Sequence, residues 1–134
     1  VVADGEGANK CITIRVCGAK EDEEAEQVAR TVANSNLVKT AFFGEDANWG
    51  RIIAAIGRSG VKVYPEKIDI AFGDVVLVRN GVCLGKDAED AATKILKEKN
   101  FSVIIDLKDG AGCEEVYTCD FSIDYVKINA DYRS

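Results

Sequence analysis

The stretch Cys11-Ile12-Thr13-Ile14-Arg15-Val16-Cys17 determines how this chain folds. Isoleucine and valine alternate in it with thiol, hydroxyl and guanidinium side chains, which places the aliphatic residues on one face. This period of two predicts a half-buried β-strand. Gly18-Ala19 ends the strand, and residues 21–34 then carry apolar side chains at helical spacing. The four acidic residues 21–24 are best explained as the solvated first turn of that helix, where its dipole favours negative charge, and not as a metal site.

The same patterns predict the remaining elements. We expect one helix that begins near Trp49, capped by Asn48, and ends near Gly57 or Gly60. Another is expected from Asp87, its cap, to about Glu98. Asn80-Gly81 between two apolar runs is typical of a β-hairpin turn. The expected strands are 11–17, 37–43, 68–72, 75–79, 82–84, 101–107 and 115–121, followed by an alternating run over 122–128.

This order of elements predicts an α/β (α+β) layered fold with a mixed sheet and about three helices. The 134 residues fit a single domain, which we assign to residues 1–134, because domains typically contain ~100–200 residues. No run approaches the ~18 apolar residues of a membrane span. The sequence has no Met and begins at Val1 without a targeting signature, so we interpret it as a piece of a longer polypeptide.

The charge and the cysteines exclude several classes of function. Lys and Arg number 17 against 23 Asp and Glu, a net charge of −6, and such an acidic chain repels the phosphates of nucleic acids. Without any His or Cys-x-x-Cys pair, the sequence lacks zinc motifs and the His-dependent routes to a nucleophile, and no metal is expected. The five cysteines are interpreted as buried, reduced thiols, with one cross-strand disulfide as the alternative.

Three segments carry side chains suited to chemistry. In residues 4–10, two glycines flank Glu6, so the backbone could approach a ligand closely; the alternative is a simple turn. Residues 44–51 combine carboxylates, an amide, an indole and a guanidinium before a helix. They form either a ligand-binding loop or a capped helix start with an ion pair from Glu45 or Asp46 to Arg51. The third segment, residues 124–134, has two tyrosines, which favour docking, into this domain or into a neighbouring chain, over a disordered tail.

Taken together, these segments resemble the ornithine acetyltransferase family, the glutamate N-acetyltransferases of arginine biosynthesis. The resemblance is carried by the motifs at residues 4–10, 37–51 and 119–134 and spans nearly the whole chain. It implies that Glu6, Asn129 and Ser134 bind substrate. Ser134 stands where the family usually has Thr, a change that keeps the hydroxyl group.

The resemblance also implies a larger enzyme. Family members are made as a precursor that cleaves itself into an α and a β chain, and the new N-terminal Thr of the β chain is the nucleophile. That Thr accepts an acetyl group from N2-acetylornithine and passes it to glutamate, and some members also use acetyl-CoA as donor; no cofactor is implied. This chain corresponds to the C-terminal part of the β chain, so the cleavage site and the nucleophile lie upstream of residue 1.

Further expectations follow from the resemblance. The partners are the α chain and the rest of the β chain, in an assembly of two α and two β chains in the cytoplasm, without nucleic acid or membrane. This chain alone is expected to be inactive, and its own threonines, which lie inside predicted elements, are not assigned as nucleophiles. The alternatives are a non-catalytic binding or oligomerisation module that shares the fold, and a relative of the self-cleaving amidohydrolases and aminopeptidases.

Overall fold

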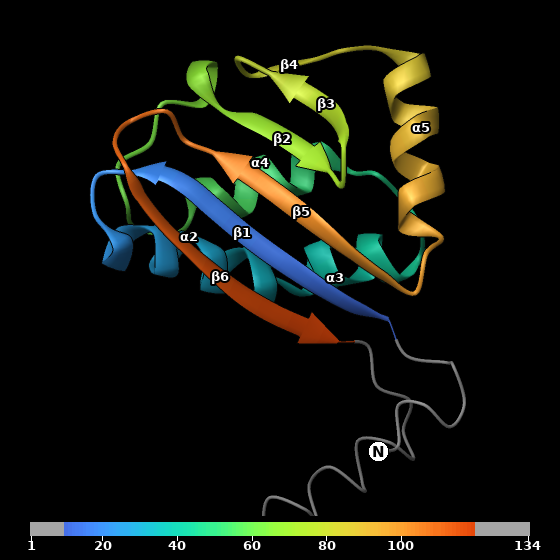
Figure 1. Cartoon of the computed structure of the whole chain (residues 1–134), viewed down its shortest axis with the longest axis horizontal. Coiled ribbons are helices and arrows are strands. Elements are labelled where there is room, and N and C mark those ends of the chain that lie inside the picture. The colour runs from blue at the N-terminus through green and yellow to red at the C-terminus, as the bar shows by residue number, and fades with distance from the viewer. Residues whose placement is uncertain (1–9, 120–134) are drawn as a thin grey trace, which may run out of the picture.

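The computed structural model describes residues 10–119, which form one layered α/β unit (Figure 1). Its sheet has six strands in the order β4-β3-β2-β5-β1-β6. The strands are β1 (Cys11–Ala19), β2 (Asp69–Phe72), β3 (Val75–Arg79), β4 (Val82–Cys83), β5 (Asn100–Asp106) and β6 (Gly112–Cys119). Only β1 and β5 run parallel, whereas the other neighbours are antiparallel, and the predicted mixed sheet is therefore confirmed.

The alternating stretch at the start of the chain forms β1 as predicted. Ile12, Ile14 and Val16 are almost completely buried, whereas every residue on the opposite face of the predicted stretch is partly or fully exposed. The apolar face is covered by α2 (Asp22–Asn34), α3 (Asn36–Phe43) and α4 (Trp49–Gly57), which lie together behind the sheet in Figure 1. α5 (Lys86–Leu96) packs against β2 and β3, and a short 3-10 helix, η1 (Pro65–Lys67), precedes β2.

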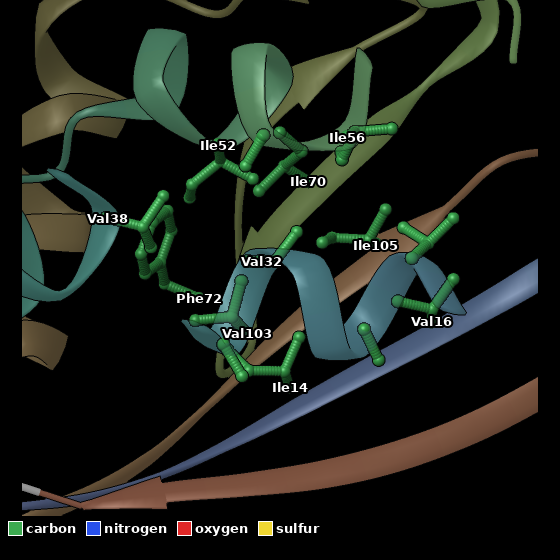
Figure 2. Close-up of a cluster of buried hydrophobic side chains, with 14 of the residues drawn as sticks. Ile14, Val16, Val32, Val38, Ile52, Ile56, Ile70, Phe72, Val103 and Ile105 are labelled. Carbon is green, nitrogen blue, oxygen red and sulfur yellow. The ribbon is translucent and has the colours of Figure 1, made fainter. Parts of the chain in front are cut away.

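The core lies between β1, β2 and β5 and the covering helices (Figure 2). Val103 and Ile105 of β5 continue the apolar face of β1, and Ile70 and Phe72 of β2 extend it. α2 contributes mainly alanine and valine, and these small side chains let its axis approach β1 and β6 closely. Phe42 of α3 closes the cluster with edge-to-face contacts to Phe72 and Phe101.

The prediction of a strand over residues 37–43 is wrong, because this segment is the helix α3. The hydroxyl oxygen of Ser35 accepts a hydrogen bond from the backbone N–H of Val38 at 3.2 Å and caps the helix. Val38, Ala41 and Phe42 then fall on one helical face and are buried. The run therefore satisfies a helical period as well as a strand, and only packing against the sheet distinguishes the two.

Three other expectations can be compared with the structure. The Asn80-Gly81 hairpin is confirmed and joins β3 to β4, with both residues at positive φ. The cap assigned to Asp87 is wrong, because α5 starts one residue earlier after Gly85 and Asp87 lies in its first turn. The described part holds four α-helices instead of three, and no described helix is long and apolar enough to cross a membrane. The alternating run over 122–128 lies outside the described residues.

Candidate functional site

The two ends of the described chain meet at one corner of the sheet. Cys11 at the start of β1 lies opposite Cys119 at the end of β6, with a Cα–Cα distance of 4.1 Å, and a disulfide joins them. The expectation of reduced thiols is therefore wrong for this pair, and the cross-strand alternative is confirmed. Residues 1–9 and 120–134, which contain all three predicted substrate residues, are thus both connected to the sheet at this corner.

An open pocket of about 480 Å³ adjoins this corner. Within the described part of the chain, α3 supplies most of its lining, and Cys119 of the disulfide also lines it. Among residues 10–119, those that line it are Asn36, Lys39, Thr40, Phe43 and Cys119. Lys39 and Asn36 both line the pocket, which suits a small polar molecule with a carboxylate, because an ammonium and an amide group can each donate hydrogen bonds to its oxygens.

A cluster of charges around Lys10 ties three segments together near the same corner. The Lys10 Nζ donates hydrogen bonds to the carbonyl oxygens of Leu96, at 2.7 Å, and Glu98, at 3.1 Å. It also lies 3.5 Å from Oε2 of Glu45. The other carboxylate oxygen of Glu45, Oε1, lies 3.5 Å from the Nζ of Lys97. Only 15% of the Lys10 side chain is exposed, so its ammonium group is partly desolvated. The Glu45 carboxylate compensates its charge there. The start of β1 is therefore fixed to the end of α5 and to the loop before α4.

The loop over residues 44–51 is largely accounted for by structure. Asn48 caps α4 as predicted, because its side-chain oxygen accepts the backbone N–H of Arg51 at 3.1 Å. The predicted ion pair from Glu45 or Asp46 to Arg51 is wrong: the guanidinium donates instead to the carbonyl oxygen of Leu37, at 3.1 Å, in α3. Asp46 accepts a hydrogen bond from the side-chain amide of Asn48 at 3.3 Å. The motif thus orients α3 and α4 relative to each other and places Glu45 beside Lys10.

The predicted substrate residues Glu6, Asn129 and Ser134 lie outside the described residues, so their assignment stays a prediction. What the structure adds is a set of cations, Lys10, Lys39 and Lys97, that the sequence did not single out. Lys10 could have been noticed because it ends the Asp-Gly-Glu-Gly segment. Lys39 and Lys97 carry no local signal, because their position at the corner depends on how helices α3 and α5 pack.

The opposite end of the sheet is held by a second charge network. The Asp69 carboxylate of β2 accepts the Lys108 ammonium at 2.8 Å and the backbone N–H of Asn80 at 2.9 Å, and Arg79 lies 3.6 Å away. Partial burial would raise the pKa of Asp69, but these hydrogen bonds and the two nearby cations together lower it below its usual value. This network stabilises the β3–β4 hairpin and faces away from the pocket corner. Within residues 10–119, no three carboxylate or thiol groups gather as a metal ion would require.

The comparison with known families covers the whole chain. The model of the ArgJ family matches residues 1–134. The arginine biosynthesis bifunctional protein ArgJ of Desulfotalea psychrophila is 76% identical over all 134 residues, and that of Geobacter sulfurreducens is 54% identical. The chain spans only about a third of these curated relatives, 34% of the length of each.

A solved structure supports the same relationship. The crystal structure of the arginine biosynthesis bifunctional protein ArgJ from Bacillus halodurans matches 98% of this chain with a TM-score of 0.80 and 44% sequence identity. This chain covers 62% of the chain it matches there. The layered fold and the resemblance carried by the sequence motifs are both confirmed, and the chain belongs to the ArgJ family.

Proposed function

We propose that this chain is the C-terminal part of the β chain of an ornithine acetyltransferase, where it forms part of the substrate site and of the assembly surface. The main support is the family match over residues 1–134, together with identities of up to 76% to arginine biosynthesis bifunctional proteins. The complete enzyme transfers an acetyl group from N2-acetylornithine to glutamate, with acetyl-CoA as a further candidate donor. It acts in the cytoplasm as an assembly of two α and two β chains.

The reaction proceeds in two steps on a nucleophile outside this chain. The hydroxyl of the N-terminal Thr attacks the acetyl carbonyl of N2-acetylornithine, the amide C–N bond breaks, and ornithine leaves with the proton. The amine of glutamate then attacks the acetyl ester, which releases N-acetylglutamate and restores the Thr hydroxyl. The hydroxyls of Thr31, Thr40 and Thr93 each donate to the carbonyl oxygen four residues earlier in a helix, so none of them is assigned as the nucleophile. In this proposal the chain contributes binding groups only.

The described geometry supports a shared site for the predicted binding residues. The segment with Glu6 enters the sheet through Lys10 and Cys11, and the segment with Asn129 and Ser134 continues from Cys119 on the adjacent strand. In this proposal Glu6 pairs with the ammonium of ornithine. Asn129 and Ser134 donate hydrogen bonds to the substrate carboxylate without adding charge. Lys39, in the neighbouring pocket, adds a positive charge near the same corner.

Substitution of Glu6 in the complete enzyme tests the proposal. A hydrogen bond to a charged group is worth roughly 1.5–3 kcal/mol, so Glu6→Ala is expected to lower kcat/KM by about 10-fold or more. Glu66→Ala is the matched control, because Glu66 is an exposed carboxylate in η1. The assay follows acetyl transfer from N2-acetylornithine to glutamate. An unchanged kcat/KM for Glu6→Ala would remove this residue from the site.

Two further outcomes distinguish the alternatives. Release of free acetate from N2-acetylornithine, independent of glutamate, would identify a hydrolase of the amidohydrolase type. Binding or assembly without any turnover by the complete α/β protein would identify a non-catalytic module. This chain assayed alone is expected to be inactive, and turnover by it would contradict the assignment of the nucleophile to the upstream part.

A further inference from the structure

The ladder between β1 and β6 carries four of the five cysteines. In the β1–β6 register the buried Ile12, Ile14 and Val16 pair with Thr118, Val116 and Glu114. Cys11, Cys17, Cys113 and Cys119 alternate with these residues, so they share the face of the sheet that α2, α3 and α4 do not cover. Cys11 and Cys119 form the disulfide at one end. Between the ends, Thr13 lies opposite Tyr117, and Arg15 lies opposite Glu115.

The other end of this ladder places Cys17 against Cys113. Val16 pairs with Glu114 and Ala19 pairs with Gly112, so Cys17 and Gly18 together oppose the single residue Cys113. This is the arrangement of a β-bulge, in which the local twist of the strand increases. Gly18 has a φ of 77°, which lets the extra residue fit without moving Cys17 off its face. Both thiols are free and partly exposed.

The electrostatics of Cys17 agree with this contact. Burial raises the pKa of the Cys17 thiol, and the neighbouring Cys113 raises it further, whereas the Arg15 guanidinium acts in the opposite direction. Arg15 is itself held in place by an ion pair with Glu115 at 2.9 Å. On balance the pKa of Cys17 is therefore raised, and its thiol lies near both a second thiol and the Arg15 guanidinium.

We propose that Cys17 and Cys113 are a second thiol–disulfide pair, which small-molecule disulfides such as glutathione disulfide convert into a cross-strand bond. One thiolate of the pair attacks a sulfur of glutathione disulfide and releases the first glutathione. The second thiolate then attacks the protein sulfur of this mixed disulfide, forms the Sγ–Sγ bond and releases the second glutathione. The protein loses two electrons and two protons, and one glutathione disulfide becomes two glutathiones.

The new bond would fasten β6 at both ends. In the sheet formed by residues 10–119, β6 is an edge strand that pairs with β1 on one side only, and edge strands are the least constrained part of a sheet. Since the Cys11–Cys119 bond already closes the long loop, the second bond encloses only residues 11–17 and 113–119. We therefore expect a change in the covalent state of β6 with little change in overall stability.

The sequence allows a direct chemical test in the complete protein. Trypsin cuts after Arg15 and Lys20 and releases Cys17 on the peptide 16–20, separate from Cys11. A protease specific for glutamate cuts after Glu114 and separates Cys113 from Cys119. After incubation with glutathione disulfide, alkylation of the remaining thiols and digestion without reductant, we expect the peptide 16–20 linked to the peptide 109–114. Its yield should exceed that of the untreated protein by about 10-fold.

Cys83 provides the matched control within the same chain. It is a free, partly exposed thiol, but it faces Val78 across the β3–β4 ladder. It should therefore carry either glutathione or the alkylating group. Cys113→Ser and, as the reciprocal variant, Cys17→Ser should each abolish the linked peptide and leave the partner cysteine with glutathione or alkylated. Alkylation or glutathione on both Cys17 and Cys113 in the folded protein, as on Cys83, would overturn the proposal.

Discussion

The two faces of β1 differ in what holds them. On one face, Ile12, Ile14 and Val16 are at most 1% exposed and pack under three helices. On the other face, Arg15 is exposed, its neighbours on that face are partly exposed, and the contacts across to β6 are thiol, hydroxyl and ionic pairs. Burial of apolar area therefore stabilises this fold, whereas the exposed polar and ionic pairs of the other face contribute little to its stability.

The largest effect should come from the covered face. Ile14→Ala removes buried methyl groups and leaves a cavity, so the free energy of unfolding should fall by ~2–5 kcal/mol in urea denaturation of the 134-residue chain. Arg15→Ala, at the next position on the open face, should leave the urea midpoint unchanged within error. Equal losses from the two substitutions would show that the faces do not differ as described.

The second effect concerns the bulge at the end of β1. Gly18 has a positive φ, and a Cβ atom there would meet the Asp106 side chain and the backbone N–H of Lys108. Gly18→Ala should therefore lower the free energy of unfolding by ~1–3 kcal/mol, because the backbone must move or remain strained. Gly57→Ala is the control, since a Cβ at Gly57 meets nothing within 4 Å; it should be neutral or slightly stabilising. Thermal unfolding followed by circular dichroism measures both.

The third effect concerns α3, the helix formed by residues whose sequence predicts a strand. Ser35→Ala removes the side-chain cap of α3 and should lower the free energy of unfolding by ~1 kcal/mol. Ser35→Asp keeps an acceptor at the cap and should restore most of the loss in the same urea titration. The same loss of unfolding free energy in both variants would show that the cap hydrogen bond does not stabilise α3.

The smallest effect belongs to the charge network around Asp69. Its pKa is lower in the folded protein than its ordinary value of 3.8, so the carboxylate stabilises the fold above that pH. This contribution should be lost as the pH falls below 3.8 through the folded pKa. Asp69→Asn should therefore be slightly less stable near pH 7 and should show a flatter decline in urea midpoint with acidification. Parallel pH profiles for both proteins would contradict the assigned shift.

Local patterns predicted much of the fold but little of the corner where the site is proposed. β1, α2, α4 and the Asn80-Gly81 hairpin follow from period, capping and turn chemistry within a few residues, and the structure confirms them. The error over residues 37–43 arose because a short apolar run is compatible with either period. The Glu45–Lys10 contact joins residues far apart in sequence, so no local pattern predicts it. Glu6, Asn129 and Ser134 rest on family resemblance and stay predictions.

The amino-acid sequence alone is enough to assign the buried face of the sheet, most of the helices and membership of the ArgJ family. The buried face and the helices depend on the order of side chains along a short segment, where a period of 2 or 3.6 residues selects the face that leaves water. The family membership depends on motifs along the whole chain. Only the tertiary structure decided that Cys11 bonds to Cys119, that Cys17 faces Cys113 and that Arg51 binds α3 instead of Glu45 or Asp46. Each of these depends on strand register or helix packing, which bring together residues that are distant along the chain.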